Sequence, residues 1–206
     1  MKTLVALNAL EFGGLTPHMK KGEIGCLLRY MQAANTLLEF GCGGSTLMAV
    51  NAGIKNILSV ESDPKWIEKL KEEYSILEAV KHQQLKFFLP DLGPVGAWGG
   101  SFDVDSKAKW HSYHSAVWQQ VDSSAIDLVF VDGRFRVACA LQALLRVRSD
   151  CKILIHDFWN RSKYHVLLDF LTVEERVESL GAFRIAEPRN NSKLLDLLFL
   201  YLNNPA

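Results

Sequence analysis

The segment LLEFGCGGST, residues 37–46, constrains the fold of this chain more than any other stretch. An apolar run of strand length ends at Glu39 and Phe40, and glycines occupy three of the next four positions. A turn of this kind, placed between a first strand and a helix, lets backbone N–H groups approach a nucleotide-like ligand. We therefore expect a ligand site at this turn.

The segments that follow the turn predict the fold class. Five apolar runs of strand length alternate with segments of helical period, which is the pattern of βα units around a parallel sheet. The runs are TLLEFG, NILSVES, LKFFLPD, DLVFVDG and CKILIHD. We predict an α/β protein with a Rossmann-like three-layer sandwich, in which helices cover both faces of a mostly parallel sheet.

The helices and the end of the chain complete this prediction. Apolar periodicity predicts helices over 63–80, 136–147 and 164–171, and a further helix near 22–31. Asp63 and Pro64 are suited to the N-cap and the first position of the first of these. Near the C-terminus, GAFRIAEP and LLDLLFLYL are strand-like runs joined by a short polar turn. They are predicted to pair antiparallel, which gives seven strands with an antiparallel C-terminal strand.

Length and charge restrict the range of functions. A chain of 206 residues is predicted to form one domain, with a helical extension at 1–35 and a Trp-rich lid or substrate loop at 93–118. Its 23 basic residues balance 23 acidic ones, which gives no electrostatic footprint for nucleic acid or a membrane surface. No apolar stretch is long enough to span a bilayer, and four scattered cysteines indicate neither zinc nor disulfides. We expect a cytoplasmic protein whose partner is a small molecule, of unknown oligomeric state.

The glycine turn distinguishes between three nucleotide ligands. A triphosphate loop needs Lys-Ser/Thr after its last glycine, but Ser45 and Thr46 follow Gly44 directly. The dinucleotide pattern GxGxxG/A nearly fits, yet Thr46 stands at its last position, and Glu39 would repel a pyrophosphate by a few kcal/mol at an effective dielectric of about 20. Glu39 would instead attract S-adenosylmethionine, because the sulfonium and amino groups of this ligand are cationic. Glu61, which ends the second run, is placed to accept both ribose hydroxyls or, alternatively, to assist the N-cap of a helix.

These motifs point to a family. LLEFGCGGST, SVESD, FLPD, DLVFVDG and ILIHD, in this order and at these spacings, resemble the class I S-adenosylmethionine-dependent methyltransferases over about residues 36–203. The resemblance implies that Glu61, with its neighbour Ser62, holds the ribose and that Asp91 lies near the adenine. Asp91 has a second interpretation, as a turn-forming residue before Gly93. The resemblance also implies that the methionine part of the cofactor faces Glu39, Gly41, Cys42, Gly43 and Ser45.

Three polar side chains follow the fourth and fifth runs, namely Asp132, His156 and Asp157. The ligand of an open α/β sheet lies beyond the carboxyl ends of the strands, so these residues are predicted to border the transferred methyl group. His156 is the candidate general base for a hydroxyl acceptor, oriented by Asp132 or Asp157. Alternatively, His156 and Asp157 only cap backbone groups, and Asp132 only starts a turn with Gly133. The two acids resemble in part the metal-binding pair of catechol-type O-methyltransferases, but Phe158 follows where those enzymes have Asn. No metal is expected, and a divalent ion held by Asp132 and Asp157 is the alternative.

The sequence constrains the methyl acceptor less than it constrains the cofactor. The fourth run lacks the (D/N)PPY signature of exocyclic-amine acceptors, which favours O-methylation of a small hydroxyl or carboxyl acceptor. Arg134, Arg136, Asn160 and Arg161 are candidates to bind an acidic or sugar substrate. The candidates to stack on its ring are Trp98, Trp110, Tyr113 and Trp118. Solvated arginines and ordinary tryptophan packing are the alternatives. Two other functions stay open: a nucleotide-linked oxidoreductase of Rossmann type, and a non-catalytic domain that binds S-adenosylmethionine or S-adenosylhomocysteine.

Overall fold

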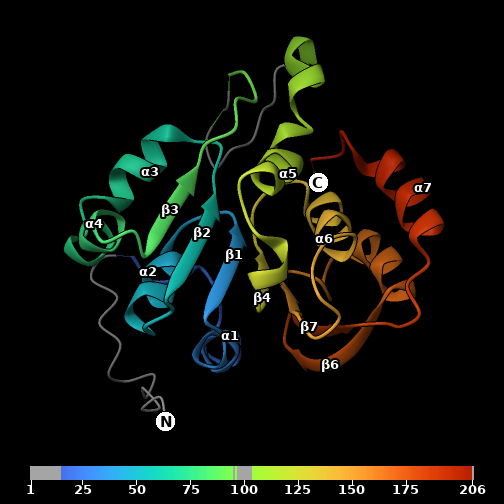
Figure 1. Ribbon diagram of the computed structural model, residues 1–206, viewed down its shortest axis with the longest axis horizontal. Helices are drawn as coiled ribbons and strands as arrows, with labels where there is room; N and C mark the ends of the chain where they lie inside the picture. The colour runs from blue at the N-terminus through green and yellow to red at the C-terminus, as the bar shows by residue number, and fades with distance from the viewer. Residues whose placement is uncertain (1–14, 95, 97–103, 206) are drawn as a thin grey trace.

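A computed structural model describes residues 15–94, 96 and 104–205, and one seven-stranded sheet forms its centre (Figure 1). The strands are β1 (Thr36–Phe40), β2 (Asn56–Val60), β3 (Leu85–Phe88), β4 (Leu128–Val131), β5 (Lys152–Ile155), β6 (Leu171–Val177) and β7 (Leu180–Ile185). Their order is β3-β2-β1-β4-β5-β7-β6. Strands β1 to β5 are parallel, and β7 runs antiparallel to both β5 and β6. The predicted α/β class, with its mostly parallel sheet and antiparallel C-terminal strand, is confirmed.

The direction in which strands are added reverses at β1. From β1 the chain moves outward to β2 and β3, and it then returns to place β4 on the other side of β1. Leu37 of β1 accordingly pairs with Ile57 of β2 on one side and with Leu128 of β4 on the other. A crevice forms at such a switch point, beyond the carboxyl ends of the strands. The glycine turn follows β1 directly and therefore lies at this crevice.

Helices cover both faces of the sheet. One face carries α1 (Lys21–Ala33), α2 (Gly44–Asn51), α3 (Pro64–Leu70) and α4 (Tyr74–Lys81), and the other carries α5 (Ser112–Ser115), α6 (Arg136–Leu144) and α7 (Asn191–Tyr201). Short 3-10 helices are η3 (Val104–Lys109), η4 (Ala116–Gln119), η5 (Ser123–Ala125) and η6 (Ser162–Asp169). Among the described residues, no helix has the length and apolar character needed to cross a lipid bilayer.

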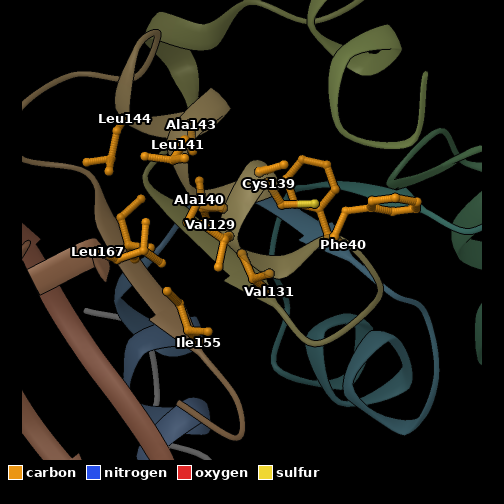
Figure 2. Packing of buried hydrophobic residues seen from close by; sticks show 14 of the residues in the cluster. Phe40, Val129, Val131, Cys139, Ala140, Leu141, Ala143, Leu144, Ile155 and Leu167 are labelled. Atoms are coloured by element: carbon orange, nitrogen blue, oxygen red, sulfur yellow. The ribbon is translucent and has the colours of Figure 1, made fainter. Parts of the chain in front are cut away.

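The alternation of side chains along each strand divides the interior into two cores. In β1, Leu37 packs in the core under α1 and α2, whereas Leu38 and Phe40 pack in the core on the opposite face. Figure 2 shows part of this second core, where Phe40 and Val131 from the sheet lie near residues of α6. Glu39, between Leu38 and Phe40, must therefore point toward the α2 face.

Local signals explain the helix boundaries. Asp63 caps α3 as predicted, because its side chain accepts a hydrogen bond from the Lys65 N–H at 2.9 Å, and Pro64 is the first helical residue. The predicted helix over 63–80 is instead two helices, α3 and α4, separated by residues 71–73. The helix predicted over 164–171 is also different, since these residues form most of η6 and the start of β6. Helices α6 and α1 confirm the other two predictions.

The strand predicted at LLDLLFLYL is wrong, because these residues lie in α7. The buried Leu194 and Leu198 are four residues apart, which is the spacing of one helical stripe, and the Asn190 side chain caps the helix. The antiparallel partner of β7 is instead β6, with sequence LTVEERV. This edge strand carries charged residues, so its hydrophobic pattern does not reveal it.

Candidate functional site

A cavity of about 630 Å³ opens at the carboxyl ends of β1, β2, β4 and β5. Its walls are formed by the glycine turn and by the residues that follow the other three strands, and residues 15–18 before α1 also line it. A second cavity of about 600 Å³ shares Ser62 and Asp63 with the first. Cavities of this size bind cofactors and small substrates.

The glycine turn is held in one conformation by close backbone packing. Gly41 has a φ of 94°, and a Cβ atom there would lie 2.6 Å from the backbone of Gly133, at the end of β4. The N–H groups of Gly41, Cys42 and Gly43 donate to Val60 O, Glu61 Oε2 and Thr46 Oγ1, at 2.8, 3.3 and 2.9 Å. These three amides are therefore already engaged within the protein and are not available to bind a diphosphate.

Glu39 does not lie at the mouth of the cavity, where the sequence placed it. Its side chain is fully buried beneath the turn, because the alternation of β1 points it toward α2. It accepts hydrogen bonds from the hydroxyls of Ser45, Thr46 and Ser59 at 2.5, 2.6 and 2.8 Å. Burial raises the pKa of Glu39 to about 7 against the opposing effect of these hydroxyls. Glu39 thus holds the turn in place.

Glu61 is the carboxylate that reaches the cavity beside the glycine turn. It follows β2, lines the cavity and is 9% exposed. Its Oε1 accepts from the N–H groups of Ser62 and Asp63 at 2.6 and 2.9 Å, while its Oε2 accepts from that of Cys42. Both of its interpretations from sequence are therefore compatible with its position. These donors are neutral, so none of them cancels the charge of Glu61.

Asp91 lies in the second cavity, with Ser62 and Asp63. Its Oδ1 accepts from the Gly93 N–H at 2.9 Å, so it forms the turn that the sequence offers as its second interpretation. Its Oδ2 lies 2.7 Å from Lys109 Nζ, and this hydrogen bond holds the pKa of Asp91 below its ordinary value. A role of Asp91 near an adenine ring stays a prediction.

The three predicted catalytic residues lie together on the opposite side of the cavity. His156 Nδ1 is 2.8 Å from Asp132 Oδ1, and Arg136 lies between the two acids, 3.1 Å from Asp132 Oδ1 and 3.3 Å from Asp157 Oδ2. Burial acts to raise the pKa of Asp157, but Asn160 and the nearby positive charges hold it below its ordinary value.

The same geometry decides how well the two acids fit a metal ion. The guanidinium of Arg136 also donates to the backbone carbonyls of Asp132, Gly133 and His156, so it is fixed between the carboxylates. A divalent cation that joined Asp132 to Asp157 would have to take the place of this cation. No group of three or more metal-ligating side chains is arranged to hold an ion in the described ranges. The donor set therefore does not fit a bridging metal.

The predicted substrate contacts separate into two groups. Arg134 lines the cavity next to Asp132. Asn160 and Arg161 do not line it, and instead donate to Asp157 at 3.1 and 2.9 Å. Trp98 lies outside the described residues.

Sequence reasoning missed Glu23, and it expected Arg136 and Tyr113 only as substrate contacts. Arg136 pairs with Asp132, four positions before it, because the turn at 132–135 between β4 and α6 brings the first residue of α6 back to the strand end. Tyr113 lines the cavity, and its hydroxyl accepts from the Arg134 N–H at 3.4 Å. Glu23 of α1 lies 3.5 Å from His156 Nε2, a contact between distant segments that no local motif indicates.

Comparisons with known proteins identify the fold. No family model and no curated protein matches the sequence. A methyltransferase-like protein from Silicibacter pomeroyi is 28% identical with a TM-score of 0.79, and the match covers 93% of this chain and 98% of that one. An S-adenosylhomocysteine-bound methyltransferase from Podospora anserina is 15% identical with a TM-score of 0.57, and the match covers 82% of this chain and 80% of that one. A precorrin-6y C5,15-methyltransferase from Geobacter metallireducens is 12% identical with a TM-score of 0.52, and the match covers 82% of this chain and 89% of that one.

The fold confirms the resemblance that the motifs indicate. The chain has the fold of the class I S-adenosylmethionine-dependent methyltransferases, and the cavity lies at the switch point where this fold binds its ligand.

Proposed function

We propose that this chain, which has the class I methyltransferase fold, transfers a methyl group from S-adenosylmethionine to a hydroxyl or carboxyl group of a small molecule. One observation carries the choice of cofactor. Glu61 brings a carboxylate to the cavity with neutral hydrogen-bond donors around it, and the N–H groups of Gly41, Cys42 and Gly43 in the adjoining turn are engaged within the protein. Such a wall attracts a cationic nucleoside and repels a diphosphate.

In this proposal, the cofactor binds on one side of the cavity and the acceptor on the other. When bound, S-adenosylmethionine supplies an electrophilic methyl group on a positively charged sulfur. Glu61 and Ser62 would accept and donate hydrogen bonds at the ribose, and the turn from Gly43 to Ser45 would face the amino-acid part. Asp132 and His156 border the opposite side, where the acceptor would be oriented for an in-line displacement.

The acceptor class rests on the side chains of that opposite side. Arg134 brings a cationic group to the cavity wall beside Asp132, where it is suited to an anionic group on the acceptor. Asp132 offers a proton acceptor of the kind that a hydroxyl requires and a carboxylate does not. We therefore place oxygen, rather than nitrogen, at the methyl acceptor position.

Calorimetric titration tests the cofactor. The full chain is expected to bind S-adenosylmethionine and S-adenosylhomocysteine, but not NAD. Glu61→Gln should weaken S-adenosylmethionine binding about tenfold or more, because it removes a charged hydrogen-bond acceptor. Glu72→Gln, at an exposed position outside the cavity, is the control and should leave the affinity unchanged. Binding of NAD alone would contradict the proposal and favour an oxidoreductase.

A second measurement tests the acceptor. The protein is incubated with S-adenosylmethionine and a mixture of small hydroxy, carboxylic and amino compounds, and the methylated product is identified by mass spectrometry. We expect products that carry the methyl group on oxygen. Methylation of the amino compounds alone would contradict the proposed acceptor class while leaving the cofactor assignment intact.

A further inference from the structure

His156 lies between two carboxylates that come from opposite sides of the ring. Its Nδ1 is 2.8 Å from Asp132 Oδ1 at the end of β4, and its Nε2 is 3.5 Å from Glu23 Oε2 of α1. The His156 side chain is only 10% exposed. Both ring nitrogens therefore face an acid, and neither nitrogen is left for the acceptor within this arrangement.

Glu23 is fixed in this position by its own hydrogen bonds. Its Oε1 accepts from the N–H groups of Ser179 and Leu180, at 2.8 and 3.2 Å, and from the Ser179 hydroxyl at 2.5 Å. Its Oε2 accepts from the Lys20 N–H at 2.9 Å. The side chain is 1% exposed. The β6–β7 turn and the start of α1 thus hold a buried carboxylate against the imidazole.

The charges around the pair agree with a protonated ring. Burial acts to lower the pKa of His156, but Asp132 and Asp157 outweigh burial and the charge of Arg136, so this pKa is raised above its ordinary value. Burial acts to raise the pKa of Glu23, but its hydrogen bonds and the charge of His156 hold it below its ordinary value. A charged imidazole at this place donates a charge-assisted hydrogen bond to Asp132 and forms an ion pair with Glu23.

Asp132 differs from His156 in that one of its oxygens has no hydrogen-bond partner among the described residues. Its Oδ1 is engaged by both His156 and Arg136, at 2.8 and 3.1 Å, while no hydrogen bond in the described chain reaches its Oδ2. The Asp132 side chain is 25% exposed and lines the cavity. Of the two residues, Asp132 therefore presents the more accessible proton acceptor.

We propose that His156 is a positioning residue, held as an imidazolium between Asp132 and Glu23, and that Asp132 is the residue that takes the proton of a hydroxyl acceptor. This assignment rests on the proposed methyltransferase function and reverses the roles expected from sequence. The acceptor oxygen forms a C–O bond to the methyl carbon as the C–S bond of the cofactor breaks, and S-adenosylhomocysteine is released. The hydroxyl proton passes to Asp132 Oδ2 and from there to water.

The test does not require the acceptor. Proton–nitrogen NMR spectra of the 15N-labelled full chain, free and saturated with S-adenosylhomocysteine, report which nitrogens of each histidine carry a proton. For His156 at pH 7 we expect both nitrogens to be protonated. His165, whose Nε2 contacts the backbone carbonyl of Phe158 rather than an acid, is the comparison within the same spectrum. A His156 with one bare nitrogen at pH 7 would overturn the proposal.

Two variants test whether the charge of Glu23 stabilises the protonated ring of His156. Glu23→Gln should lower the pH at which His156 loses its proton by about one unit or more, because it removes one of two nearby negative charges. Glu23→Asp keeps the charge and should restore most of this shift. A His156 titration that does not change in Glu23→Gln would show that Glu23 plays only a structural role. Calorimetry with S-adenosylmethionine on the same samples separates these outcomes from failure of the proposed function, which would appear as loss of cofactor binding in the wild type.

A chemical probe examines Asp132. Carbodiimide-activated coupling of a small amine to the protein saturated with S-adenosylhomocysteine should modify Asp132 and leave the buried Glu23 and Glu39 unmodified. Peptide mapping by mass spectrometry reads the result. Protection of Asp132 in the folded protein, together with modification in urea, would show that Asp132 does not face the acceptor space and would overturn its assignment.

Discussion

The two sides of the cavity hold their carboxylates by different means. On the cofactor side, Glu39 and Glu61 receive hydrogen bonds from hydroxyl and backbone N–H groups, all of them neutral. On the acceptor side, Asp132 and Asp157 are paired with the cation of Arg136. The cofactor side therefore keeps the negative charge of Glu61 for a cationic ligand, whereas the acceptor side balances its charges internally.

The difference extends to how the two sides are assembled. The cofactor side comes from one continuous segment, in which β1, the glycine turn, α2 and β2 follow each other along the chain. The acceptor side joins the ends of β4 and β5 to α1 and to the β6–β7 turn. A charge network built from distant segments depends on its central cation, while the turn depends on backbone geometry. Mutations should therefore affect the two sides differently.

The largest effect is expected at the central cation of the acceptor side. Arg136→Met leaves Asp132 and Asp157 partly buried and without their shared cation, which should lower the free energy of unfolding by about 3–5 kcal/mol. Arg136→Lys keeps the charge, but an ammonium group does not reproduce the fork of donors, so we expect a smaller loss. Urea unfolding measures both. A loss below about 1 kcal/mol in Arg136→Met would show that the acceptor side does not depend on this ion pair.

The next effect concerns the backbone of the cofactor side. Gly41→Ala forces a side chain onto a residue with a φ of 94° and places its Cβ 2.6 Å from the Gly133 backbone, so a loss of about 3 kcal/mol or more is expected. Gly53→Ala is the matched control, since its φ is 74° but no heavy atom lies within 4 Å of the added Cβ. It should cost only about 1 kcal/mol. Equal losses in the two variants would contradict the close packing of the turn.

The third effect depends on pH and concerns Glu39. Its folded pKa of about 7 lies above the ordinary value of 4.5, so protonation favours the folded state. This stability is fully present below about pH 4.5 and is lost as the pH rises through 7. Relative to Glu39→Gln, which does not titrate, the wild type should lose about 3 kcal/mol of unfolding free energy between these limits. Urea unfolding across this range measures the difference, and a constant difference would refute the raised pKa.

The comparison also explains what the sequence could predict. The Asp63 cap was accessible because its geometry is set by a residue two positions away. The positions of the glycine turn and of Glu61 were accessible because each directly follows a strand that its apolar run reveals. The direction of Glu39 was not, since the pattern of β1 does not say which face α2 will cover. The contact between Glu23 and His156 depends on how α1 docks, and α7 was mistaken for a strand because a short leucine-rich run is compatible with both structures.

The smallest effect is expected at the outer cation of the acceptor side. Arg161 lies 2.9 Å from Asp157 Oδ2, but its side chain is 42% exposed, and Asp157 keeps both Arg136 and Asn160 as partners. Arg161→Ala should therefore lower the free energy of unfolding by about 0.5 kcal/mol, less at high salt, and should leave S-adenosylmethionine binding unchanged. Urea unfolding at low and high salt, together with calorimetry, gives both quantities. A loss close to that of Arg136→Met would mean that the charge balance depends on the whole chain of ion pairs rather than on its buried centre.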